Sequence, residues 1–152
     1  MGPYNVSIYR YKIILYGGTI MLNIYTIETI MKTAYYEIID KLELTNEPEL
    51  IITKEASNEL ATGYYNHTKN IVVVILSEDI EQMIESLCHE CRHAWQYERY
   101  GKAYLSSVNS IDHDDYLDYY YNEYEMDARQ YAEDNYKDVY EYAYEANEYL
   151  FD

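Results

Sequence analysis

The chain has 152 residues, 49% of them apolar, which fits one folded domain with a hydrophobic core and excludes a disordered chain. Its net charge of −17 at pH 7 excludes binding to nucleic acid through phosphate contacts, which requires a basic surface. The two cysteines lie on one short stretch, which excludes a scaffold held together by disulfides.

An apolar run over residues 13–22, preceded by Arg10 and Lys12, lies near the N-terminus. It lacks the small-residue cleavage site of a signal peptide, is interrupted by glycines, and is too short to span a bilayer. We therefore expect a cytoplasmic protein without a membrane partner. Because Met21 lies at the end of this run, residues 1–20 are predicted to be a dispensable extension of a single domain that comprises residues 1–152.

Hydrophobic periodicity and turn signals predict an α+β fold. The expected elements are a helix over 24–43, a strand over 49–55, a hairpin over 62–76, a helix over 78–100 that ends at Gly101, a loop over 102–113, and from residue 114 onward one long helix or two helices joined near Asn135. The last segment contains neither Gly nor Pro, which favours a continuous helix.

The helix predicted over 78–100 has two different faces when residues are placed 100° apart. One face is an apolar stripe, formed by Ile80, Met83, Ile84, Leu87, Cys91, Ala94 and Trp95. His89 and His93 lie on the opposite side, so neither is expected to be an ordinary core histidine. On the next long helix Glu125 lies on the shoulder of the apolar face, whereas Glu123 points nearly the opposite way. A buried carboxylate needs a partner, and a metal held by the two histidines would be one.

His89, Glu90 and His93 form a His-Glu-x-x-His motif. On a helix both imidazoles lie on one face, one turn apart, where each can reach a zinc ion at about 2.0–2.1 Å. A third ligand, for which Glu125 is the candidate, leaves one position open for water, as in catalytic zinc sites. Glu90 would take the proton of a zinc-bound water as it attacks a carbonyl and pass it to the leaving amine. The residues alone therefore predict metal-assisted hydrolysis.

This constellation resembles the gluzincin class of zinc metallopeptidases, most of all the small ImmA/IrrE-like and SprT-like domains of prokaryotes and phages. The matching features are CHECRH at 88–93, the preceding strand NIVVVILS at 70–77, and EMDA at 125–128. The resemblance covers roughly residues 50–132. It implies a minimal zincin-like fold with an N-terminal helix, a small, mostly antiparallel sheet with a hairpin, an active-site helix and a long C-terminal helix.

The resemblance also implies roles for individual residues. His89, His93 and Glu125 would be zinc ligands, Glu90 would be the base, and the strand 71–76 would bind a peptide or protein substrate by β-addition. One departure concerns Arg129, which stands where many gluzincins carry an Asp that orients a histidine. Glu123 and Asp127 do have that four-residue spacing, so Glu123 remains an alternative third ligand.

Other interpretations stay open at this point. The acidic composition also fits a non-enzymatic binding protein, such as an inhibitor or a nucleic-acid mimic, and the motif also fits a zinc-binding protein of zincin fold without proteolysis. Cys88 and Cys91 form a C-x-x-C, but their place within a helix favours packing over redox chemistry. Tyr121 is a candidate for stabilising the oxyanion, although packing is the simpler interpretation. The substrate, its cleavage site and the oligomeric state are left open by the sequence.

Overall fold

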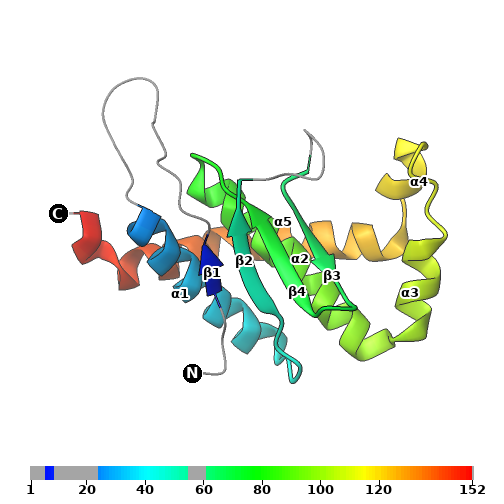
Figure 1. Cartoon of the computed structure of the whole chain (residues 1–152), viewed down its shortest axis with the longest axis horizontal. Coiled ribbons are helices and arrows are strands. Elements are labelled where there is room, and N and C mark those ends of the chain that lie inside the picture. The colour runs from blue at the N-terminus through cyan, green and yellow to red at the C-terminus, as the bar shows by residue number, and fades with distance from the viewer. Residues whose placement is uncertain (1–5, 9–23, 55–60, 152) are drawn as a thin grey trace.

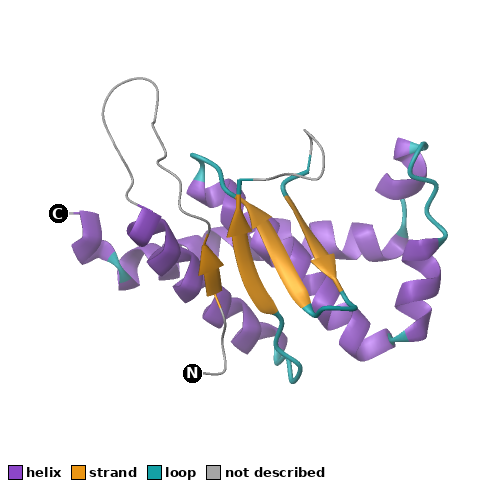
Figure 2. Ribbon diagram, viewed as in Figure 1, coloured by secondary structure: helices purple, strands orange, loops and turns teal. Residues whose placement is uncertain are grey.

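The computed structural model describes residues 6–8, 24–54 and 61–151, and within them an α+β fold (Figures 1 and 2). The elements in chain order are β1 (Val6–Ile8), α1 (Ile24–Leu42), β2 (Glu49–Thr53), β3 (Gly63–Asn66), β4 (Ile71–Ile75), α2 (Ile80–Tyr100), α3 (Lys102–Asn109), α4 (Tyr116–Tyr120), α5 (Glu123–Ala146) and the 3-10 helix η1 (Glu148–Phe151). The predicted first helix, strand, hairpin and histidine-bearing helix are confirmed to within two residues at each end. Apart from β1, the predicted dispensable extension lies outside the described residues.

The four described strands form one mixed sheet in the order β1-β2-β4-β3. The prediction of a mostly antiparallel sheet is wrong, because β1 pairs with β2 and β2 pairs with β4 in parallel, and only β3 runs antiparallel to β4. The Val-rich strand β4 is buried through its centre, and it forms backbone hydrogen bonds along both of its edges. Since β4 takes the interior position, β3 is the outer strand on the side of the candidate site.

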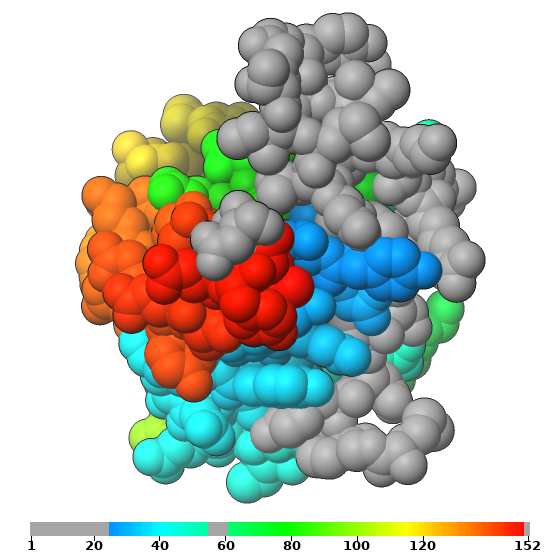
Figure 3. Space-filling model, turned by 90° about the vertical axis from the view of Figure 1, so that its left-hand side faces the viewer, coloured from blue at the N-terminus to red at the C-terminus, as the bar shows by residue number. Residues whose placement is uncertain are grey.

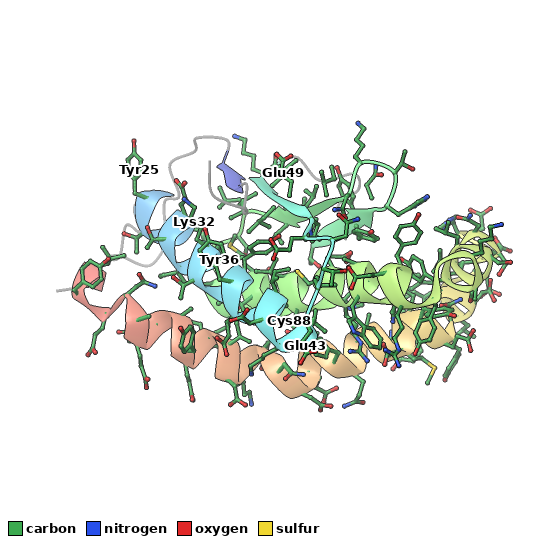
Figure 4. The ribbon with its side chains drawn as sticks, turned by 90° about the horizontal axis from the view of Figure 1, so that it is seen from below. Tyr25, Lys32, Tyr36, Glu43, Glu49 and Cys88 are labelled. Atoms are coloured by element: carbon green, nitrogen blue, oxygen red, sulfur yellow. The ribbon has the colours of Figure 1, made fainter. Side chains whose placement is uncertain are left out.

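Helix α2 lies between the sheet and α5. It packs against β3 and β4 on one side and against α5 on the other, while α1 packs beside it and also contacts α5 (Figure 4). The apolar stripe of α2 enters the main core through Met83, Ile84, Leu87 and Cys91. The side of α2 that carries the histidines is enclosed as well, because α5 covers it. His93 on this side is accordingly only 4% exposed.

The C-terminal end of the chain is fixed against α1. Figure 3 shows the end of α5 beside α1 at this end of the molecule, and Asn147 Nδ2 donates to Thr33 Oγ1 at 3.0 Å. No helix in residues 24–54 or 61–151 combines the length and the apolarity that crossing a bilayer requires.

Two predictions about the second half of the chain are wrong. The expected loop over 102–113 contains the helix α3, and the long C-terminal helix is interrupted at Asn122, not near Asn135. The Asn122 side chain accepts hydrogen bonds from the backbone N–H groups of Tyr124 and Glu125, and so caps the start of α5. Because α4 is a separate helix, Leu117 and Tyr121 do not continue the buried face of α5 and are 60% and 64% exposed.

Gly63 is required where β3 passes over β4 and α2. A Cβ atom at this position would lie 2.6 Å from the carbonyl oxygen of Val73 and 3.4 Å from Cγ of Glu90. The first distance is shorter than any ordinary contact, and a backbone atom in a sheet cannot move away freely. Gly63 therefore allows the edge strand to lie directly above Glu90.

We predict that Gly63→Ala lowers the free energy of unfolding by about 1–3 kcal/mol, because the added methyl group displaces β3 from β4. Urea denaturation followed by far-UV circular dichroism would measure the change. The control is Tyr64→Ala in the same strand, whose side chain is 41% exposed and whose loss should cost less than about 1 kcal/mol. Equal stability of the Gly63→Ala variant and the wild type would contradict the tight packing of β3.

Candidate metal centre

Helix α2 brings two imidazole nitrogens to one place. His89 and His93 lie one turn apart near the middle of α2, and their Nε2 atoms are 3.2 Å from each other. The ring planes meet nearly edge to face, with centroids 4.9 Å apart. Glu90 follows His89 directly, is 8% exposed, and places Oε1 4.0 Å from Nε2 of His89. The three residues of the motif thus surround one small region.

Helix α5 supplies a carboxylate to the same region. Glu125 lies in the first turn of α5, and its Oε2 is 3.1 Å from Nε2 of His89 while its Oε1 is 3.0 Å from Nε2 of His93. The predicted inward orientation of Glu125 is confirmed, since it is 8% exposed. Glu123 is exposed, and within the described residues the structure brings Glu125 and not Glu123 to the two histidines.

Gln96, which is fully buried on α2, fixes the orientation of His93. Its Nε2 donates to the carbonyl oxygen of Tyr124 at 2.9 Å and to Oδ2 of Asp127 at 2.7 Å. Both of these partners can only accept, so the amide oxygen of Gln96 must face His93 Nδ1, at 2.8 Å. An amide oxygen only accepts, and therefore His93 Nδ1 carries the proton. In the neutral ring, Nε2 then presents its lone pair to Glu125 and His89.

Asp127 and Arg92 support Gln96 from outside. Arg92 donates to Asp127 through Nε at 2.8 Å and through an Nη at 3.2 Å, while its guanidinium lies 3.7 Å from the centre of the Trp95 ring. Burial raises the pKa of Asp127, but the hydrogen bonds from Arg92 and Gln96 outweigh burial and lower it. Asp127 thus orients His93 indirectly, through Gln96. Arg129 lies four residues after Glu125, where many gluzincins carry an Asp that orients a histidine. Its guanidinium instead donates to the carbonyl oxygen of Tyr120.

The electrostatics of the region favour a positive charge. Burial lowers the pKa of His93, but the hydrogen bond and the charge of Glu125, together with Glu90, raise it to about 9. Burial raises the pKa of Glu125, yet hydrogen bonds with His89 and His93 hold it well below its usual value. Burial also raises the pKa of Glu90, and the neighbouring histidines offset this only in part. A raised pKa suits a carboxylate that takes up and returns a proton.

The donor set fits a divalent metal such as zinc. Ligand atoms that lie about 2.0–2.1 Å from a tetrahedral zinc ion are roughly 3.3 Å from one another. The observed separations of 3.0, 3.1 and 3.2 Å among the two imidazoles and the carboxylate are close to that value. Two ring nitrogens and a carboxylate are all acceptors when unprotonated, so at least one cation or proton has to lie among them. Two His and one Glu are also a known ligand set of catalytic zinc.

Two residues of the candidate centre, His89 and Glu90, line a cleft of about 1200 Å³. Residues 61–64 of the β3 region and His113, Tyr116 and Tyr119 from the segment before α5 also line it. Tyr119, which is 38% exposed, interacts with the carboxylate of Glu125, and the partial burial of its hydroxyl together with that negative charge raises its pKa. Helical spacing alone pointed to Tyr121, which is exposed; Tyr119 became recognisable only once the break before α5 was known.

The two cysteines do not take part in this centre. Cys88 and Cys91 are fully buried free thiols in the core between α2 and its neighbours. Burial raises the pKa of Cys88 to about 12 and that of Cys91 well above its usual value. Reactive thiols have lowered pKa values, so this environment favours a packing role.

An α+β fold in which one helix carries His-Glu-x-x-His and the next long helix supplies an inward Glu defines a class of small proteins with a candidate three-residue metal centre. The chain belongs to the DUF3920 family, whose model, described as a protein of unknown function, matches residues 51–143. The matched span includes all the residues of the candidate centre together with Gln96 and Asp127. Searches of the curated proteins and of the solved structures gave no match.

We predict that Gln96→Leu weakens zinc binding about 10–100-fold, because the proton on His93 Nδ1 loses its acceptor and the ring is no longer held. Competition with a zinc chelator would measure the affinity. The matched control is Gln82→Leu on the same helix, where the amide donates to Ser86 and not to a histidine. Circular dichroism verifies that both variants are folded. Unchanged zinc affinity in a folded Gln96→Leu variant would contradict the orienting role of Gln96.

Proposed function

We propose that the protein is a zinc-dependent metallopeptidase that hydrolyses peptide bonds. His89, His93 and Glu125 would hold the zinc, and Glu90 would be the general base. The observation that carries the proposal is the convergence of three acceptor side chains from two helices beside a second carboxylate, that of Glu90, where His89 and Glu90 line an open cleft. Structural zinc sites are closed by four protein ligands, whereas the donor set found among the described residues has three, of which His89 lines the cleft.

The reaction is the addition of water to a peptide carbonyl, followed by loss of the amine. Zinc, when bound, polarises the carbonyl and lowers the pKa of water. Glu90 accepts a proton from the attacking water as the new C–O bond forms, and delivers that proton to the amide nitrogen as the C–N bond breaks. The raised pKa of Glu90 supports this role, because it brings the carboxylate closer to the pKa that suits a general base near neutral pH. Gln96 keeps His93 in the tautomer that can bind a metal.

The strand that would hold the substrate differs from the expected one. Strand β4 cannot accept a peptide by β-addition, because both of its edges are paired. The backbone N–H of Ile75 donates to the carbonyl of Thr62. In an antiparallel pair, residues that bond to the partner strand alternate with residues whose N–H and C=O groups point outward. Gly63 and Tyr65 therefore direct their N–H and C=O groups away from β4. We propose that an extended substrate pairs with this outer edge of β3, which borders the cleft beside Glu90.

The first test of the proposal is zinc content. We predict about one zinc ion per purified chain after loading, and loss of binding in both His93→Ala and Glu125→Ala, since each removes a ligand. Elemental analysis with protein quantification would measure the ratio. Glu123→Ala is the matched control, because Glu123 lies two residues before Glu125 and is exposed.

An absence of zinc binding in the wild type would overturn the proposal and leave the acidic binding protein as the better interpretation. Loss of zinc in Glu123→Ala but not in Glu125→Ala would instead identify Glu123 as the third ligand.

The second test separates a peptidase from a zinc protein without proteolysis. We predict that Glu90→Gln lowers kcat by about 10²–10⁴-fold while zinc content stays unchanged, because only the proton acceptor is lost. Cleavage of a quenched fluorescent peptide library would measure the rate. Glu85→Gln is the control, since Glu85 lies in the same cleft but is not part of the candidate centre. Zinc-loaded wild type that cleaves no peptide in the library would support a non-proteolytic zinc protein.

A further inference from the structure

The segment 112–121, which we call the acidic–aromatic segment, is exposed at every one of its ten positions. It contains four aspartates, at 112, 114, 115 and 118, and one histidine. It also holds five of the eleven exposed large hydrophobic side chains in the described part of the chain, namely Tyr116, Leu117, Tyr119, Tyr120 and Tyr121. Such a concentration of uncovered aromatic area is typical of a surface that binds a partner.

The position of the segment relates it to the candidate centre. His113, Asp114, Tyr116 and Tyr119 line the same cleft as His89 and Glu90. In Figure 1, α4 lies at the end of the molecule beyond β3, and both β3 and the segment contribute residues to the lining of the cleft. A polypeptide in the cleft would contact β3 on one side and the acidic–aromatic segment on the other.

The conformation of the segment is set by its own side chains. Asp118 accepts a hydrogen bond from the backbone N–H of Asp112, Asp112 accepts one from Asp114, and Asp115 caps α4 at Leu117. Each of these carboxylates keeps a second oxygen for other partners. Because the segment is already ordered by these contacts, a partner would not have to supply the free energy for ordering it.

The combination of carboxylates and tyrosine rings selects a cationic partner, and among cations it favours arginine. The chain itself contains such a contact: the Arg129 guanidinium lies 3.9 Å from the centre of the Tyr120 ring and donates to the carbonyl oxygen of Tyr120 at 2.8 Å. A guanidinium combines stacking on a ring with hydrogen bonds to carboxylates, which an ammonium group does less well. The net charge of −17 attracts the same kind of partner over a longer range.

We propose that the acidic–aromatic segment is a docking surface for an arginine-rich stretch of the polypeptide substrate, next to the cleft. The inference rests on the proposed function only in calling that polypeptide a substrate; the recognition itself does not require hydrolysis. It therefore names a substrate class for the candidate peptidase: proteins with an exposed basic segment near the cleaved bond.

Binding is tested with the full-length Glu90→Gln variant, which should not cleave the probe. Fluorescence anisotropy would measure the affinity for a labelled peptide of Arg-Gly repeats at low ionic strength, with Lys-Gly and Glu-Gly peptides of equal length for comparison. We expect the order Arg-Gly, then Lys-Gly, with no binding of Glu-Gly. In the same background, Asp114→Asn/Asp118→Asn and Tyr116→Ala/Tyr121→Ala should each weaken Arg-Gly binding by about fivefold.

The matched controls remove the same groups at the other end of the molecule. Glu145→Gln/Glu148→Gln removes two exposed acids, and Tyr142→Ala/Tyr149→Ala removes two exposed tyrosines. The proposal is overturned if the control variants weaken binding as much as the segment variants do, since the attraction would then be one of net charge alone. Equal binding of the Glu-Gly peptide would overturn it as well.

The outcome is separable from that of the proposed function. Arginine-selective binding that depends on the segment, in a protein without zinc or hydrolysis, would support the docking surface and refute the peptidase. The opposite result is also possible: the wild type hydrolyses peptides without a preference for basic ones, and the segment variants leave kcat/KM unchanged. This result would support the peptidase and refute the docking surface.

Discussion

The contact between Gln96 and its three partners is the constraint on which the candidate centre depends. Every polar atom of this buried amide is used, since it accepts from His93 and donates to both Tyr124 and Asp127. If the amide were turned over, so that its NH₂ group and its oxygen exchanged places, buried polar groups would be left unpaired. Each unpaired group would cost about 1–3 kcal/mol. The same hydrogen bonds join α2 to α5. One side chain therefore sets the tautomer of a histidine and the spacing of the two helices that carry the centre.

The arrangement is costly unless a cation is present. Glu90, His93 and Glu125 are all less than a tenth exposed, and the two glutamates lie on facing helices. Helix α2 can carry these groups because its other face is held by the sheet and the apolar core, with Leu87 and Cys91 fully buried. A cation bound among the acceptors would stabilise the folded state by linkage, in proportion to its concentration and affinity. A metal bound there would thus be connected to the fold through the α2–α5 contact.

The sequence predicts those parts of the molecule in which local periodicity decides the structure. The 3.6-residue period located α1 and α2 and pointed Glu125 inward, and the β-branched run with its turn located the hairpin. The parallel pairing of β2 with β4 depends on which strands meet across the sheet, and neither strand carries that information. The break before α5 did have a local signal, since Asn122 with Glu125 three residues later is a capping pattern. The contact of Gln96 with Asp127 has no local signal in the sequence, because the two residues lie on different helices.

The negative charge of the chain has two different consequences, depending on where it lies. Inside, Glu90 and Glu125 are matched against two histidines in a largely buried region, where each carboxylate needs a specific positive partner. Outside, the aspartates of the segment 112–121 stand in water, where each attracts a cation weakly and several attract it together. A basic polypeptide would be attracted by the aspartates at the surface before it reached the buried glutamates. An acidic polypeptide would be repelled at the mouth of the cleft, so the surface charge alone would already restrict which chains reach Glu90.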